Sequence, residues 1–205
     1  MSYDAPAAGT PGHREFDLSD PLRSFIDTTV RVVRQPTAFF EQLPRRAGYL
    51  NPTVYGVTCA VISALLGFAA YELLGVPPGG SIVGPTDVAG GTALWVLLDA
   101  LALILVGLFL AAAVTHVAVR IVVGYENSGL EATFRVMAYS AALFLLDWLP
   151  YIGWVFAVYA FYVTLVGIRE VHRTTTGKAL GALLLPLLLF LPFLACFLLS
   201  LLADG

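Results

Sequence analysis

SGLEATFRVMAYSAALFLLDWLPYIGWVFAVYAFYVTLVGIREVHRTTTGK, residues 128–178, contains two apolar runs that are each long enough to cross a lipid bilayer. Only Pro150 and its neighbours separate the two runs. Charged side chains lie at both ends, Glu131 and Arg135 at the start and Arg169 to Lys178 at the finish. We therefore interpret this stretch as a membrane helical hairpin with a tight turn, whose two open ends face the same aqueous side.

The composition excludes an ordinary soluble domain. Hydrophobic residues make up 59% of the chain and charged residues only 12%, whereas soluble domains have roughly 45–50% and about 25%. The net charge of −3 is too small to indicate nucleic-acid binding. Cys59 and Cys196 lie in separate apolar runs, which gives no metal-binding spacing and no disulfide framework, and we expect two free thiols. Lys178 is the only lysine among many arginines, which favours a GC-rich bacterial source.

Apolar runs along the rest of the chain predict an all-α integral membrane protein with five transmembrane helices. Each run approaches or exceeds the ~20 residues that a ~30 Å hydrocarbon layer requires. The expected spans are residues 52–74, 92–123, 129–149, 151–170 and 177–202. Pro186 and Pro192 should kink the last one, because proline removes a backbone donor and crowds the preceding turn. We divide the chain into a disordered tail (1–19), an interfacial amphipathic region (20–50) and a five-helix transmembrane domain (51–205).

The basic residues test this count independently, because cytoplasmic segments of membrane proteins are enriched in Lys and Arg. With a cytoplasmic N-terminus and five spans, every basic residue falls on the inner side, and the outer loops and the C-terminus carry none. We therefore expect an integral protein of the bacterial cytoplasmic membrane, with its N-terminus inside and its C-terminus outside.

Residues 20–50 are expected to form an amphipathic helix beside the membrane. Asp20 and Pro21 provide an N-cap and a first helical position, and Pro36 ends the helix. Apolar residues fall on one face and arginines mostly on the other, as in helices that lie in the bilayer interface and attract anionic lipids. Packing against the inner ends of the spans is the alternative, and both can hold. The candidate interface residues are Phe25, Ile26, Arg31, Arg34, Phe39 and Phe40.

Three acidic residues are placed near the outer side of the membrane, where no basic residue is available to pair with them. They are Glu72, Asp99 and Asp147, with apolar residues on both sides of Asp99. Ionisable side chains in spans are costly and are functional candidates by default. They could converge on a cation or proton site, or they could be interface-level acids that reach water.

A second polar layer is expected near the inner side. His116 and Arg120, like Glu131 and Arg135, are four residues apart, so each pair shares one helix face. If the two helices are neighbours, Arg120 can reach Glu131 in a neutralised layer, and we favour this structural role over a substrate site. The pattern from Ser128 to Glu131 also fits a capping box. His172 is expected in a solvated basic loop.

Catalytic patterns are missing from the sequence. It contains no Gly-rich phosphate loop, no HExxH, no GxSxG and no Cys/His metal spacing. We therefore expect a protein that is not an enzyme and that has no cofactor and no metal site.

Several features in order resemble the Yip-domain membrane proteins. They are Pro36–Leu43 before Gly48-Tyr49 and Asn51-Pro52, Phe134-Arg135 and Ala138–Ser140, the turn Leu149–Gly153, Tyr159, Tyr162, Val166-Gly167, and His172 with residues 174–179. The resemblance implies a five-span helical protein with a cytoplasmic N-terminus and no known enzymatic activity. Eukaryotic members are associated with vesicle traffic and Rab-type GTPases. This chain lacks their long tail and DLYGP-like motif, so the resemblance does not extend a GTPase role to it.

Two functions from different classes remain open. The first is a non-enzymatic membrane scaffold that organises lipids or partner proteins, or that forms a homo-oligomer, through the amphipathic region and the inner basic loops. The alternative is a small cation- or proton-coupled transporter or channel that uses the outer carboxylates.

Overall fold

The computed structural model describes residues 15–74, 93–146, 148–149 and 152–203, and the side chains of these except residues 71–72, 74, 93–100, 190 and 192–203. All regular secondary structure in this part of the chain is helical. Its elements are α1 (Pro21–Arg34), α2 (Pro36–Glu41), α3 (Leu50–Leu74), α4 (Ala93–Val122), α5 (Leu130–Ser140), the 3-10 helix η1 (Ala141–Leu146), α6 (Gly153–Val171) and α7 (Thr176–Ala203).

Three of these helices are long and apolar enough to cross a membrane. The qualifying segments are Leu50–Ala70 in α3, Leu101–Val122 in α4 and Gly153–Val171, which is α6. The first part of α7, Thr176–Leu189, counts as a shorter apolar helix. Large apolar side chains on these helices are exposed, as expected where lipid replaces water around a protein. The chain is therefore a helical membrane protein with several spans, in agreement with the composition.

The third expected span differs from the prediction of one continuous helix over residues 129–149. An eleven-residue α-helix, α5, is followed by the six-residue 3-10 helix η1. A 3-10 helix rises about 2.0 Å per residue instead of about 1.5 Å. Neither piece is among the described helices that are long and apolar enough to cross a membrane, so the expected continuous span over this segment is replaced by two shorter helices.

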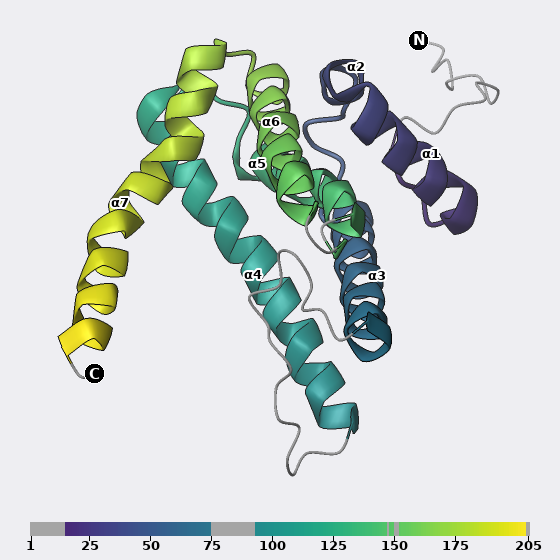
Figure 1. The fold of residues 1–205 in the computed structure, drawn as a ribbon. Helices are drawn as coiled ribbons and strands as arrows, with labels where there is room; N and C mark the ends of the chain where they lie inside the picture. The colour runs from purple at the N-terminus through teal and green to yellow at the C-terminus, as the bar shows by residue number, and fades with distance from the viewer. Residues whose placement is uncertain (1–14, 75–92, 147, 150–151, 204–205) are drawn as a thin grey trace, which may run out of the picture.

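Proline positions explain the boundaries of the N-terminal helices. Pro21 opens α1 and Pro36 opens α2, with Gln35 between the two helices. Asp20 occupies the N-cap position as expected, but its side chain makes no capping hydrogen bond. Helix α7 runs through Pro186 and Pro192 as one helix, and it bends part-way along its length in Figure 1. Such a bend is expected where a ring displaces the preceding turn.

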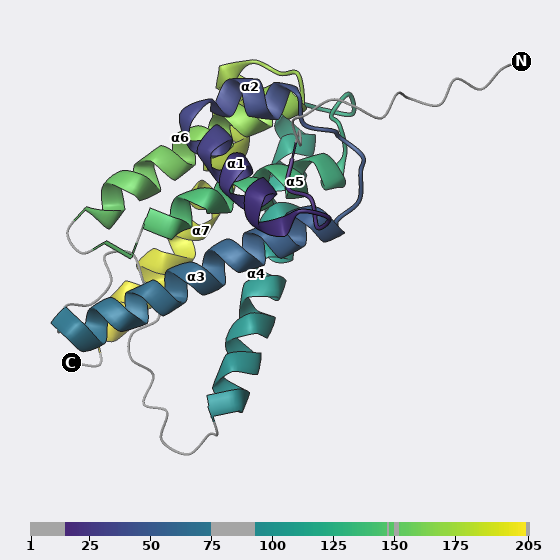
Figure 2. The ribbon, with the colours of Figure 1, turned by 90° about the vertical axis from the view of Figure 1, so that its right-hand side faces the viewer.

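The helices form a bundle that is covered at one end. Helix α4 packs along α5 and α7, α3 packs along α5 and η1, and α2 lies on α6. Figure 1 shows α2 at the same end of the bundle as the α4–α5 and α6–α7 connections, whereas α7 finishes at the opposite end. Figure 2 shows α1 and α2 lying over the end where α5 and α6 meet. The main buried cluster lies beneath them and includes Val32, Phe39, Phe40, Tyr55, Tyr139, Val163 and Ile168.

Candidate functional site

A fully buried arginine on α5 is the centre of the polar structure at the covered end. Arg135 donates from Nη1 to the carbonyl oxygen of Gly48 at 2.9 Å. Its Nη2 contacts the Oε2 of Glu15, and its guanidinium lies 5.9 Å from the centre of the Tyr139 ring. The Tyr139 hydroxyl donates to the same Glu15 oxygen at 2.9 Å. Two donors therefore converge on one carboxylate oxygen that comes from the segment before α1.

This segment belongs to the stretch for which the sequence predicts a disordered tail, and residues 1–14 of that stretch lie outside the described part of the chain. Residues 15–19 have defined contacts. Phe16 is only 3% exposed, and its ring lies 5.7 Å from that of Tyr55. The backbone N–H of Asp17 donates to Ser24 Oγ at 3.1 Å, and Ser24 donates back to the Asp17 carbonyl at 2.8 Å. No helical period marks these residues, so the sequence carries no signal for their role.

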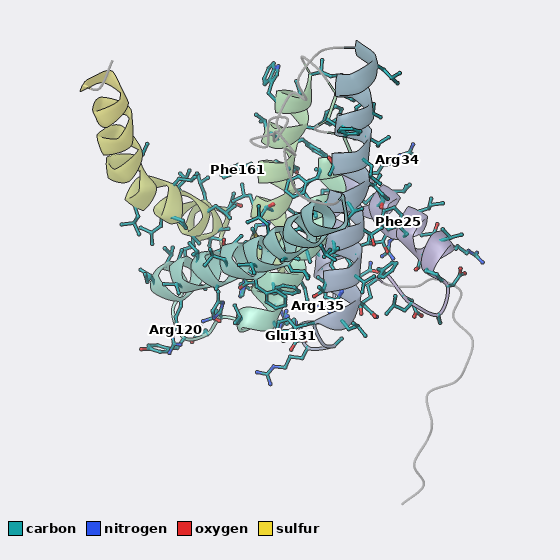
Figure 3. The ribbon with its side chains drawn as sticks, turned by 90° about the horizontal axis from the view of Figure 1, so that it is seen from below. Phe25, Arg34, Arg120, Glu131, Arg135 and Phe161 are labelled. Atoms are coloured by element: carbon teal, nitrogen blue, oxygen red, sulfur yellow. The ribbon has the colours of Figure 1, made fainter. Side chains whose placement is uncertain are left out.

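Glu131 also has a different role from the expected one. Its Oε1 accepts hydrogen bonds from the backbone N–H groups of Ala47 and Gly48, both at 2.7 Å. Arg120 instead lies over the ring of Tyr125, 5.1 Å from its centre. Helices α4 and α5 are neighbours, as the expected pairing required. Figure 3 nevertheless shows Arg120 apart from Glu131, while Glu131 and Arg135 lie close together.

Gly48 is consequently held on both sides of its backbone by α5. Glu131 accepts from its N–H, and Arg135 donates to its carbonyl oxygen. Gly48 has a φ of +87°, a conformation that glycine adopts without the steric cost that a Cβ adds. The capping box expected at Ser128 does not form. Gly129 is the N-cap of α5, and Ser128 Oγ donates to the Val171 carbonyl at 2.6 Å.

His116, the remaining member of the expected inner layer, belongs to a chain of polar groups between α4, α5 and the end of α6. Its Nδ1 lies 2.9 Å from Thr133 Oγ1, which lies 3.0 Å from His172 Nε2. The backbone N–H of Ser128 donates to His172 Nδ1 at 3.0 Å. Because Nδ1 accepts, the proton of the neutral ring lies on Nε2 and is donated to Thr133, whose hydroxyl can then donate to His116.

His172 is therefore not in a solvated loop, since it is only 3% exposed. Burial lowers the pKa of His172 to about 4, with smaller contributions from the nearby His116 and Arg45. The neutral ring matches its hydrogen bonds, because a protonated Nδ1 could not accept from Ser128. Thr133 was not among the expected site residues. A threonine one turn into a helix gives no distinguishing signal in the sequence.

Helix α1 is divided into three sectors. Ser24, Thr28 and Val32 are buried against the bundle. Leu22, Ile26 and Val30 are 80%, 60% and 43% exposed, and at about 100° per residue they fall within an arc of ~80°. Arg23, Asp27 and Arg34 follow in the next arc, where Arg23 and Asp27 form an exposed ion pair at 3.9 Å. An apolar strip thus runs beside a charged one on the outer surface of this helix.

The aromatic residues expected at the membrane interface lie mostly inside the protein. Phe25 is half-buried, with its ring 5.2 Å from that of Tyr55. Phe39 and Phe40 are buried between α2 and the bundle, and Arg31 lies over the Phe39 ring at 5.6 Å. Of the candidate interface residues, only Ile26 and Arg34 are exposed. Figure 3 shows Phe25 and Arg34 on α1.

The expected outer acidic site lies outside the part of the chain that can be discussed. Asp147 is not among the described residues, and the side chains of Glu72 and Asp99 are not described either. Within the described residues, no group of three or more His, Cys, Asp or Glu side chains is placed to hold a metal ion.

Comparison with protein families identifies the arrangement. Residues 30–197 match the Yip1 domain, which is most of the chain. The chain belongs to the Yip1-domain family. The matched region of this Yip1-domain protein contains Arg135, Tyr139 and the polar chain from His116 to His172, whereas Glu15 and most of α1 precede it. Members of the family are generally non-enzymatic membrane proteins of trafficking. Comparisons with curated proteins and with solved structures found no match.

Proposed function

We propose that this Yip1-domain protein is a non-enzymatic membrane organiser that holds the inner surface of the bilayer through α1. The observation that supports this most directly is the exposed strip of Leu22, Ile26 and Val30 on a helix whose opposite side packs against the bundle. An isolated exposed leucine needs no explanation. Three apolar residues in register on a helix next to membrane spans are typical of an interfacial helix.

The charged strip supports the same orientation. With the apolar strip toward the acyl chains, the strip of Arg23, Asp27 and Arg34 turns toward headgroups and water. Basic residues near an anionic membrane surface contribute about 1 kcal/mol each. We therefore propose anionic lipids as the partners of this surface, with the N-terminal region on the cytoplasmic side. Protein partners or a second copy of the chain would be recruited to the same face.

Site-directed spin labelling of the full chain in liposomes tests this role. After the native cysteines are replaced, Ile26→Cys on the apolar strip and Asp27→Cys on the charged strip each receive a nitroxide. We expect the label at Ile26 to be accessible to oxygen dissolved in the acyl chains and protected from a water-soluble nickel complex. The neighbouring label at Asp27 should show the reverse, and both contrasts should strengthen with anionic lipid.

The paired positions make the result decisive. Equal exposure of both labels to the nickel complex, in neutral and anionic liposomes, would show that α1 stands in water. The organiser role would then lose its support. A label at Thr28→Cys, which is buried against the bundle, reports separately whether α1 keeps its docked position.

A further inference from the structure

The contact between Glu15 and Arg135 resembles an occupied binding site more than a structural ion pair. Arg135 is fully buried, and its Nε has no hydrogen-bond partner among the described residues. A buried guanidinium N–H without a partner is costly. Arginine and a carboxylate usually form two parallel bonds that use both sides of the fork. Here the donors at Nη2 and at the Tyr139 hydroxyl both use Oε2 of Glu15.

The site therefore has more donors than Glu15 satisfies. The Nε and Nη2 of Arg135 and the hydroxyl of Tyr139 form a set of three donors, of which Glu15 engages two through a single oxygen. A tetrahedral phosphate presents several oxygens in different directions, so it can accept from Nε and Nη2 side by side and from the hydroxyl as well. Arginine is the preferred residue for such bidentate phosphate recognition.

The position of Arg135 in the fold also suits the binding of a phosphate group. Arg135 holds the carbonyl of Gly48, which lies two residues before α3 begins, and Arg45 and Arg46 precede it in the same connection. Two further arginines thus lie within three residues of the backbone group that Arg135 holds, just before the first long apolar helix. The competing carboxylate belongs to a short segment before α1 and to no helix, and its side chain is 16% exposed. Its departure would break no helical backbone hydrogen bond.

We propose that Arg135 and Tyr139 form an oxyanion site for a phosphate group, and that Glu15 is its intramolecular competitor. The phosphate enters when the segment at Glu15 and Phe16 lifts away, and it takes the place of the carboxylate on Nη2 and the tyrosine hydroxyl. A lipid headgroup and a soluble phosphate share this chemistry. The site does not depend on α1 binding the membrane, because none of the exposed apolar residues of α1 contributes to it.

The test measures phosphate binding by the purified full chain with Glu15→Gln, which removes the competing charge. A tethered ligand acts at an effective concentration in the mM range, and its removal raises the population that can bind. We expect Glu15→Gln to lower the Kd for inorganic phosphate, or for phosphatidic acid in phosphatidylcholine nanodiscs, at least about tenfold. Glu41→Gln is the matched control, because it removes one exposed negative charge on α2 that does not reach the site.

Each result decides the question. A gain with both probes supports the site and shows that the phosphate group alone suffices, whereas a gain with phosphatidic acid alone assigns the site to a lipid headgroup. Adding Tyr139→Phe to Glu15→Gln should reverse most of the gain. Equal affinities for wild type, Glu15→Gln and Glu41→Gln would overturn the proposal, and so would a gain that survives Tyr139→Phe unchanged. If Glu15→Gln lowers expression, Glu15→Ala removes the competing carboxylate as well, and its failure to raise the affinity also counts against the site.

Discussion

The hydroxyl of Tyr159, midway along α6, donates a hydrogen bond of 2.6 Å to the carbonyl oxygen of Val33, near the end of α1. The two residues are 126 positions apart. This bond satisfies a carbonyl of the last turn of α1, a group that has no partner within its own helix. It therefore caps the last turn of α1 and ties this helix to α6 at the same time.

Replacing Tyr159 by Phe should lower the free energy of unfolding by about 1 kcal/mol, the net value of a typical hydrogen bond. The lost bond should also make α1 more accessible to protease. Tyr162→Phe is the control, since Tyr162 stacks beside Tyr159 and is 48% exposed. Thermal unfolding in detergent and limited proteolysis measure both effects. Equal losses in the two variants would contradict a specific role for this bond.

Gly167 predicts a second stability effect. A Cβ at this position would lie 2.5 Å from Val136 Cγ1 and 3.2 Å from the ring of Phe40. Gly167→Ala should therefore force α2, α5 and α6 apart, at a cost of about 1–3 kcal/mol. A Cβ added to Gly107 in α4 would meet no atom within 4 Å, so Gly107→Ala should be neutral or stabilising by up to ~1 kcal/mol. Melting temperatures in one detergent compare the two, and a melting temperature for Gly167→Ala at or above wild type would refute the packing argument.

His172 predicts a pH dependence of stability. Its pKa is about 4 in the folded protein and about 6.5 in an unfolded chain, so the unfolded state binds more protons between these values. The free energy of unfolding should fall as the pH drops from about 6.5 to about 4, by up to about 3 kcal/mol, and this contribution should level off below pH 4. Unfolding midpoints of wild type and His172→Gln across this range measure it. The His172→Gln profile should be flatter, and parallel profiles would exclude His172 as the cause.

The distribution of basic residues predicts the orientation in the membrane. All 11 Lys and Arg residues fall on one side if the chain crosses five times, and that side should be cytoplasmic. Reporter fusions that are active only in the cytoplasm or only outside it should show an inner N-terminus and an outer C-terminus. Two ends that report the same compartment would require an even number of crossings.

The helices could be predicted from the sequence because their signals are local. Pro21 and Pro36 mark the start of α1 and of α2, and runs of apolar residues reveal the long helices whatever they pack against. The family could be recognised for a related reason, since its features are spread in order along the chain. Burial of Phe39 and Phe40 was harder to predict, because an aromatic residue suits a lipid interface and a protein interior equally well.

The partners of the polar residues could not be predicted in the same way. Glu131 and Arg135 were expected to share a helix face, and they do, but their partners come from residues 47–48 and from Glu15. These segments have no periodicity. Every non-proline residue also carries the same backbone N–H and carbonyl groups, so the sequence does not indicate which of them a side chain will bind. The change from α5 to the 3-10 helix at Ala141 likewise has no local signal, since neither glycine nor proline interrupts residues 130–146.

The hold of α5 on Gly48 has a mechanical consequence. Gly48, in the connection between α2 and α3, is hydrogen-bonded through both its N–H and its carbonyl group to Glu131 and Arg135, which are one helical turn apart on α5. A flexible connection between α2 and α3 would let α1 and α2 move independently of the long helices. Because both side chains belong to α5, a displacement of this connection would act directly on α5, which packs against α3, α4 and α6. If α1 holds the membrane surface as proposed, its position is thereby coupled to the packing of the bundle.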